Sequence, residues 1–145
     1  MYDERMIAPM RQELTRLGIE ELRTADDVDA KLKDSKGTTL VVVNSVCGCS
    51  ARNARPAVAM ALQGAAKPDQ LTTVFAGQDT AATAKARSYF TGYAPSSPSI
   101  ALLKDGRLVY MLERHQIESR SADAIAKDLE GAFEKYCGER AAAGR

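Results

Sequence analysis

Residues 38–49 read TTLVVVNSVCGC, a run typical of a β-strand that leads into a pair of cysteines. The stretch from Thr38 to Asn44 is rich in β-branched residues and almost uniformly apolar, which indicates a central strand covered on both faces. Cys47 and Cys49 follow it, separated by one glycine. Such a pair is a redox couple, half of a metal site, or two buried residues that are close by chance, and the rest of the sequence has to distinguish these three.

The composition is that of a single soluble domain. The chain has 145 residues, of which 45% are hydrophobic and 27% charged, so it can bury a core without disulfide staples. Its 20 Lys and Arg are balanced by 19 Asp and Glu, and neither sign is clustered. With a net charge near zero, the protein has no strong electrostatic field to attract a polyanion. We therefore expect neither nucleic acid nor a membrane as a partner.

The amino terminus predicts a cytoplasmic protein. Residues 1–18, MYDERMIAPMRQELTRLG, alternate charged and apolar residues at helical spacing. They lack the basic start, apolar middle and small-residue cleavage site of a signal peptide, and no apolar stretch approaches the roughly 20 residues of a membrane span. Disulfides in the cytoplasm are more often transient and catalytic than structural, which favours chemistry at the cysteine pair.

The order of the predicted elements indicates an α/β fold. They are a helix over residues 7–17, an edge strand at 19–22, a helix over 24–36, the strand 38–44, a helix over 52–66, a strand at 71–75, a helix over 79–90, strands at 99–103 and 108–112, and a helix over 121–136. Alternating strands and helices predict a parallel sheet with helices on both faces. The Asp105-Gly106 turn signal adds an antiparallel hairpin. We expect one domain, with residues 1–36 as a helical extension and sheet edge, and 138–145 as a frayed tail.

The predicted fold places Cys47 and Cys49 where a central strand ends and a helix begins. Reacting groups gather at that edge of an open parallel sheet, and the amides and helix dipole there stabilise a thiolate. A disulfide across one intervening residue closes a small, strained ring, and strain makes it easier to reduce. Gly48 suits the linking position, because glycine tolerates unusual backbone conformations. The pattern therefore favours redox chemistry.

Two other classes of protein remain open. A metal-binding or metal-carrier protein could use the two thiolates, but zinc takes four ligands and the remaining candidates, Cys137 and His115, lie far along the chain. A non-catalytic interaction module with the same fold is the second alternative. We expect Cys137 to end the last helix without a chemical role, and His115 to be structural or exposed.

The arrangement resembles the thioredoxin superfamily. Cysteines follow a central strand, Pro98 immediately precedes the next strand but one, and a Lys-Asp-Gly turn comes after it. In that superfamily the proline is cis and faces the cysteines, and the backbone just before it pairs with substrate. The resemblance implies a thioredoxin-like fold with a central mixed sheet, and a substrate-binding role for Ser97 and Pro98.

Within this superfamily the sequence is similar to the bacilliredoxin family. The similarity runs from MYDE to Tyr136-Cys137 and is carried by LVVVNSVCGC, TVFAGQD, ATAKARSYFTGYAPSSPSIALLKDG and the residues around RHQIE. Bacilliredoxins are small cytosolic proteins that remove the low-molecular-weight thiol bacillithiol from cysteines of other proteins. Some also show weak disulfide isomerase or reductase activity.

This resemblance assigns a role to each residue of the CGC motif. Cys47 matches the nucleophile that attacks the mixed disulfide, Cys49 the cysteine that resolves the adduct, and Gly48 the substrate-contacting glycine between them. It implies no metal and no organic cofactor, with bacillithiol as co-substrate, S-thiolated proteins as clients and a recycling reductase.

Arg52 and Arg55 are predicted to be solvated helix residues, with support of Cys47 or binding of the carboxylates of a small thiol as the alternative. The exposed face of the amino-terminal helix is a candidate surface for a homodimer.

Overall fold

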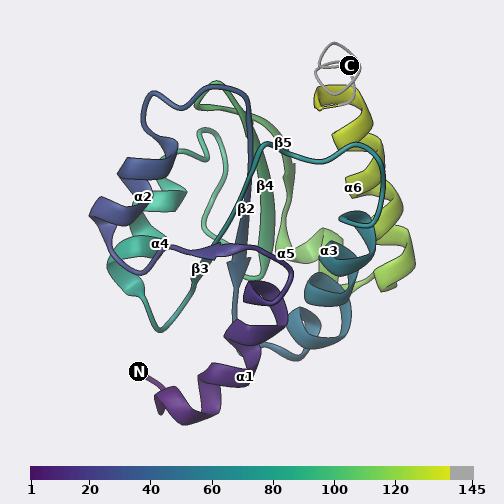
Figure 1. The fold of residues 1–145 in the computed structure, drawn as a ribbon. Coiled ribbons are helices and arrows are strands. Elements are labelled where there is room, and N and C mark those ends of the chain that lie inside the picture. Colours follow the sequence, from purple (N-terminus) through teal and green to yellow (C-terminus); the bar gives the residue numbers. More distant parts are fainter. Residues whose placement is uncertain (138–145) are drawn as a thin grey trace.

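The computed structural model describes residues 1–137 and contains a five-stranded mixed sheet (Figure 1). The strands are β1 (Glu20–Glu21), β2 (Thr38–Asn44), β3 (Gln70–Phe75), β4 (Ser99–Lys104) and β5 (Arg107–Leu112). Their order across the sheet is β1-β3-β2-β4-β5. β1, β3 and β2 are parallel, whereas β4 is antiparallel to both of its neighbours. β2 is thus the central strand, as its residue pattern predicts. The predicted tail, 138–145, lies outside the described residues.

Helices cover both faces of this sheet (Figure 1). One face carries α2 (Ala25–Leu32) and α4 (Thr80–Arg87), and the other carries α3 (Arg55–Ala61), α6 (Ala122–Tyr136) and the end of α1 (Glu4–Thr15). A short helix, α5 (Arg114–Glu118), follows β5. None of the helices in residues 1–137 combines the length and apolar character needed to cross a membrane.

The side chains of β2 alternate between the two cores. Leu40 and Val42 pack on the side of α3 and α6, whereas Val41 and Val43 pack on the side of α2 and α4. All four are fully buried, and burial of each side chain contributes roughly 1.5 to 3 kcal/mol. This two-sided burial fixes the register of β2, and therefore fixes where the chain leaves the sheet at Asn44.

Several local signals are confirmed. Thr24 begins α2 with a capping box, and Ser121 caps α6 by accepting a hydrogen bond from the N–H of Ala124. Asp105 and Gly106 both have positive φ, 51° and 80°, which is the geometry of a tight hairpin turn. This turn lets β4 and β5 pair as an antiparallel hairpin.

The predicted helix over residues 52–66 begins differently and is shorter. A π-helical turn, η1 (Ser50–Ala54), comes first, and α3 ends at Ala61. Pro56 has no N–H to donate to the carbonyl oxygen of Arg52, so a regular α-helical hydrogen bond cannot form between them. The chain therefore leaves the cysteines through a widened turn.

The helix predicted over residues 79–90 is α4, and Asp79 precedes it without capping it through its side chain. Its carboxylate instead binds the buried guanidinium of Arg11 at 2.7 Å, and the same guanidinium binds Glu4 and Glu21 at 2.7 Å each. This cluster joins α1 to β1 and to the start of α4. It fixes the amino-terminal helix against the sheet.

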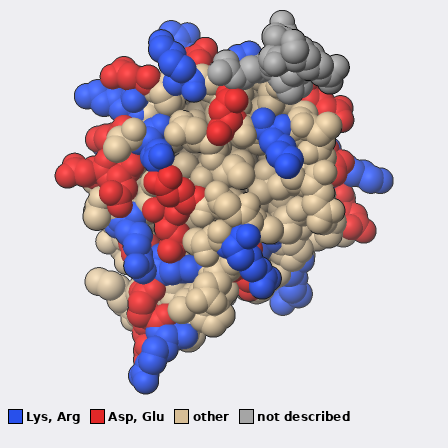
Figure 2. All heavy atoms as spheres, viewed as in Figure 1, with Lys and Arg blue, Asp and Glu red and all other residues tan. Residues whose placement is uncertain are grey.

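Basic and acidic side chains are interspersed on the face shown in Figure 2, and neither sign covers it alone. This distribution agrees with the near balance of 20 basic and 19 acidic residues in the sequence.

Candidate active site

The cysteine turn is anchored by the side chain of Asn44, the last residue of β2. Its Oδ1 accepts hydrogen bonds from the N–H of Ser45 at 2.9 Å, from the hydroxyl of Ser50 at 3.0 Å and from Nη1 of Arg55 at 2.8 Å. All four residues are buried. One side-chain oxygen therefore holds together both ends of the turn that carries the two cysteines.

Arg55 is a buried support of this turn, so its interpretation as a solvated helix residue was wrong. Only 3% of it is exposed. Besides Asn44, its guanidinium binds the carbonyl oxygen of Ser45 at 3.1 Å and the carboxylate of Glu13 in α1 at 3.0 Å. A buried charge needs such partners, because it has lost its hydration. Arg52, in contrast, is exposed as predicted.

Gly48 lies exposed in the first helical turn after β2. Its φ is not positive, so the unusual backbone conformation expected of this glycine is not used while the cysteines are free. A Cβ at this position would lie 2.8 Å from Nη1 of Arg52. That contact involves the end of a flexible side chain, which leaves room for adjustment.

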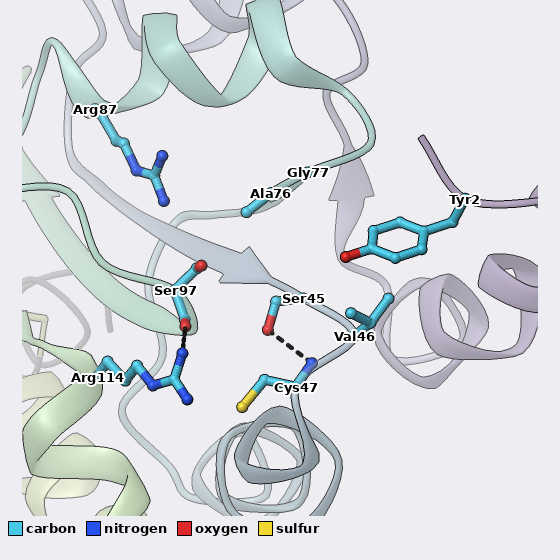
Figure 3. A pocket seen from close by; sticks show the side chains of 9 residues that line it. All are labelled: Tyr2, Ser45, Val46, Cys47, Ala76, Gly77, Arg87, Ser97 and Arg114. Atoms are coloured by element: carbon cyan, nitrogen blue, oxygen red, sulfur yellow. Dashed lines mark hydrogen bonds between the residues drawn. The ribbon is translucent and has the colours of Figure 1, made fainter.

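The two thiols of the pair are in direct contact but differ in exposure. Both cysteines are free, and their Sγ atoms lie 2.8 Å apart. Cys49 is 5% exposed, whereas Cys47 is half-buried and lines a pocket of about 360 Å³. Figure 3 shows the Sγ of Cys47 beside this pocket. A molecule in the pocket therefore meets Cys47, with Cys49 behind it.

The surroundings of the two thiols move their pKa values in opposite directions. The hydrogen bond from the Cys49 thiol lowers the pKa of Cys47 most, and the N–H of Cys49 and the positive charge of Arg114 lower it further, against the effect of burial. Burial raises the pKa of Cys49, and so do its hydrogen bond to Cys47 and the charge there. Cys47 is therefore the thiol that ionises first, and the thiolate is the attacking species.

The loop before β4 contributes to the same pocket. The Ser97–Pro98 peptide bond is cis. Ser97 lines the pocket together with Cys47, whereas Pro98 is buried and does not line it. The carbonyl oxygen of Ser97 accepts a hydrogen bond of 3.4 Å from Nη1 of Arg114 (Figure 3). The structure therefore brings Ser97 to Cys47, with Pro98 directly next to Ser97 in the chain.

Cys137 ends the last helix and His115 is exposed, as predicted. The buried thiol of Cys137 donates to Oγ1 of Thr38 at 3.4 Å, at the start of the strand whose far end leads to Cys47. Seven residues of strand span roughly 20 Å. The side chain of His115 is 71% exposed and pairs with Glu113.

The cysteine pair has few candidate metal ligands around it. Within residues 1–137, no group of three or more His, Cys, Asp or Glu side chains is arranged to hold a metal ion. A structural zinc ion takes four such ligands, so the described residues offer the pair as two ligands at most.

Sequence analysis missed Arg114, Arg87 and Tyr2, which complete the pocket lining. The topology of the sheet was a usable signal for Arg114: β5 runs parallel to β2, because each is antiparallel to β4, so Arg114 leaves the sheet at the same edge as Cys47. Its five-residue helix is too short to show a helical period. Nothing in the local pattern around Arg87 or Tyr2 indicated their position.

A partly exposed thiol of lowered pKa, backed by a buried thiol at the end of a central strand, defines a thiol–disulfide oxidoreductase. A sequence model of the family described as disulphide isomerase matches residues 2–137. The chain is 57% identical over 143 residues to a bacilliredoxin of Koribacter versatilis, covering 99% of both chains. It is 54% identical over 137 residues to one of Bacillus licheniformis, covering 94% of this chain and 95% of that one. The chain belongs to this family, the bacilliredoxins.

Solved structures show the same fold at much lower identity. The thioredoxin of Malassezia sympodialis matches with a TM-score of 0.55 at 13% identity, over 81% of this chain and 90% of that chain. The thioredoxin of Fasciola hepatica matches with a TM-score of 0.54 at 18% identity, over 81% and 99%. These matches confirm the predicted thioredoxin-like fold.

Proposed function

We propose that the protein removes bacillithiol from mixed disulfides on other proteins, with Cys47 as the nucleophile and Cys49 as the resolving thiol. The observation that carries this proposal is the asymmetry of the pair: the Sγ atoms lie 2.8 Å apart, but Cys49 is 5% exposed and Cys47 lines the pocket. The name shared by the relatives, bacilliredoxin, supports bacillithiol as the small thiol.

In the first step the Cys47 thiolate attacks the bacillithiol sulfur of the mixed disulfide. The old S–S bond breaks, the client protein leaves as a thiolate that takes up a proton from water, and bacillithiol becomes attached to Cys47. A lowered pKa of Cys47 favours this step, because more of the thiol is ionised near neutral pH. The backbone of Ser97, beside Cys47, is the proposed contact for the client chain.

In the second step Cys49 loses its proton and attacks the Sγ of Cys47. Bacillithiol leaves as the free thiol, and the Cys47–Cys49 disulfide forms. The buried Cys49 reaches this sulfur without contacting the client, because it lies directly behind Cys47. A recycling reductase then supplies two electrons and two protons. The protein needs no organic cofactor for these steps, and we place them in the cytoplasm, where thiols are kept reduced.

A weak disulfide isomerase or reductase activity follows from the same attack directed at a protein disulfide. It is consistent with the description of the family as disulphide isomerase.

The intact mass of a reduced Cys49→Ala variant, mixed with a bacillithiol-modified protein, tests the proposal. We expect one bacillithiol adduct on Cys47 and release of the client as a free thiol. Cys47→Ala should gain no adduct, and Cys137→Ser should retain the full reaction of the wild-type protein, because Cys137 lies at the other end of β2.

Two other results would have different meanings. Reaction with glutathione and cysteine mixed disulfides but not with bacillithiol would remove the bacillithiol specificity and leave the oxidoreductase. No reaction with any disulfide would contradict the proposed function and direct attention to metal binding, which a cobalt titration of the reduced protein measures.

A further inference from the structure

Arg87 is a cation without a counter-ion at the edge of the pocket beside Cys47. Among residues 1–137, no carboxylate forms an ion pair with it, and its buried Nε has no hydrogen-bond partner. Its one hydrogen bond runs from Nη2 to the carbonyl oxygen of Ser96 at 3.1 Å. Burial lowers its pKa, with no opposing contribution from an acid. The fold thus holds a partly buried guanidinium whose donors are only partly satisfied by the protein.

Arg114 is the second cation of the same pocket. Figure 3 shows Arg87 entering from α4 and Arg114 from α5, on either side of Ser97. The Nε of Arg114 donates a hydrogen bond to the carboxylate of Glu118 at 2.9 Å, and its Nη1 donates one to the carbonyl oxygen of Ser97 at 3.4 Å. Its Nη2 forms no hydrogen bond with any described residue.

The rest of the pocket lining is neutral apart from Cys47. It consists of Tyr2, Ser45, Val46, Ala76, Gly77 and Ser97. No Asp or Glu of the described chain lines it. Its volume of about 360 Å³ is in the range of small-molecule sites. An anionic small molecule would find two guanidinium groups and no competing carboxylate inside the pocket.

We propose that Arg87 and Arg114 form a carboxylate-binding subsite that selects an anionic low-molecular-weight thiol on the disulfide attacked by Cys47. The inference rests on the proposed function and adds the chemical class of the small thiol. A guanidinium binds a carboxylate through charge-assisted N–H donors. Both arginines line the pocket, and Nη1 of Arg87 and Nη2 of Arg114 form no hydrogen bond with any described residue. Binding there places the thiol half of the disulfide in the pocket, so that its sulfur meets Cys47.

Arg87 gives the cleaner test of the two. The charge of Arg114 also lowers the pKa of Cys47, so removing it changes the nucleophile as well as the pocket. Arg87→Gln removes the charge, and Arg87→Lys keeps the charge but loses the fork of donors. Lys85→Gln is the matched control: Lys85 is a cation of the same helix that pairs with Asp29, outside the pocket.

The substrates are mixed disulfides of one single-cysteine peptide with small thiols of different charge. The probes are 3-mercaptopropionate, which carries a carboxylate, neutral 2-mercaptoethanol and cationic cysteamine. The rate constant of each variant is divided by that of the wild-type protein for the same substrate, which cancels the intrinsic reactivity of each disulfide. Melting temperature and the pKa of Cys47 are measured for every variant, so that a change in fold or nucleophile is detected.

We expect Arg87→Gln to slow the reaction of the 3-mercaptopropionate disulfide about tenfold, the effect of losing one charge-assisted hydrogen bond. The neutral and cationic probes should react at wild-type rates, Arg87→Lys should recover part of the loss, and Lys85→Gln should show none. An equal loss on all probes, or no loss on any, would overturn the subsite.

A second peptide distinguishes the two sources of a carboxylate. The first peptide has Asn beside its cysteine. The second has Asp at that position and is joined to 2-mercaptoethanol. If Arg87→Gln slows the reaction of this second peptide and leaves that of the 3-mercaptopropionate disulfide unchanged, the carboxylate that Arg87 binds belongs to the peptide. That result would overturn the assignment to the small thiol. Failure of the wild-type protein to react with any probe and also with the bacillithiol mixed disulfide of the same peptide would instead contradict the proposed function itself. Reaction with the bacillithiol disulfide but with no probe would overturn a subsite that selects by charge alone, so the two failures are distinguishable.

Discussion

Nη1 of Arg55 lies 2.8 Å from Oδ1 of Asn44, and this contact joins the start of α3 to the end of the strand that leads into the cysteines. Both side chains are buried. The active-site turn is therefore held by a polar contact between buried side chains. The two thiols are not bonded to each other as a structural disulfide.

Asn44→Ala should destabilise the protein by about 3 kcal/mol, because it removes the acceptor that three buried donors share, one of them charged. Urea unfolding of the reduced protein measures this loss. Asn53→Ala is the control, since the partly buried side chain of Asn53 makes one hydrogen bond, to the carbonyl oxygen of Ile117, and should cost about 1 kcal/mol. Equal losses in the two variants would show that Asn44 does not anchor the turn.

Alkylation of Cys47 should rise with pH through a midpoint below the usual pKa of cysteine. The native contacts favour its ionised form, so the reactive thiolate appears at lower pH than in an unfolded chain. Because the thiol of Cys49 is the largest cause of this shift, Cys49→Ala should move the midpoint up, and Cys49→Ser, which keeps a donor, should move it less. Iodoacetamide kinetics in a Cys137→Ser background give the midpoint, and an unchanged midpoint in Cys49→Ala would contradict the assigned cause.

Arg114→Gln should raise the pKa of Cys47, because the positive charge of Arg114 stabilises the thiolate. The same alkylation profile measures the shift, and added salt should shrink the difference between variant and wild type. His115→Gln is the neighbouring control: its exposed imidazole pairs with Glu113, and its removal should leave the profile and the exchange rate unchanged. An equal response of the two variants would exclude a specific role for Arg114.

Arg11→Met should destabilise the protein by about 2 kcal/mol, because it leaves Asp79 and Glu21 facing each other without the buried guanidinium. The cluster also predicts acid sensitivity. Hydrogen bonds from Arg11 and, to a smaller extent, from Gln78 lower the pKa of Glu4 from 4.5 to about 2. The stability from this ionised carboxylate is complete above pH 4.5 and is lost as the pH falls towards 2.

Urea unfolding between pH 6 and 2 compares Arg11→Met with the wild-type protein. The wild-type protein should lose more stability over this interval than the variant, in which Glu4 has lost its main partner. Parallel losses would show that other carboxylates cause the acid sensitivity.

Elements defined by local patterns were predictable from the sequence. The bounds of β2 agree with the predicted strand, because its apolar residues are buried on both faces. The capping box at Thr24 and the Asp105-Gly106 turn also depend on neighbours in the chain. The cis bond before Pro98 came from family resemblance, since a proline alone gives no such indication.

Long-range polar pairs were not predictable. Arg55 and Arg11 occur in helical segments with charged neighbours, where exposure to solvent is the ordinary expectation. Each is nevertheless buried and forms an ion pair with a carboxylate from a distant element. Arg87 is unusual in the opposite sense, because it is partly buried without such a partner. A sequence pattern reports which face of a helix is apolar, but it does not report which charges meet after folding.

The central position of β2 has a consequence for how the protein responds to oxidation. β2 is paired with β3 and β4 and is buried along all seven of its residues, so its amide hydrogens exchange with solvent only when the whole sheet opens. The turn that begins after Asn44 lies beyond this ladder. Closing and opening the cysteine pair therefore rearranges the short turn that follows Asn44, while the paired strand before it keeps its place through repeated turnovers.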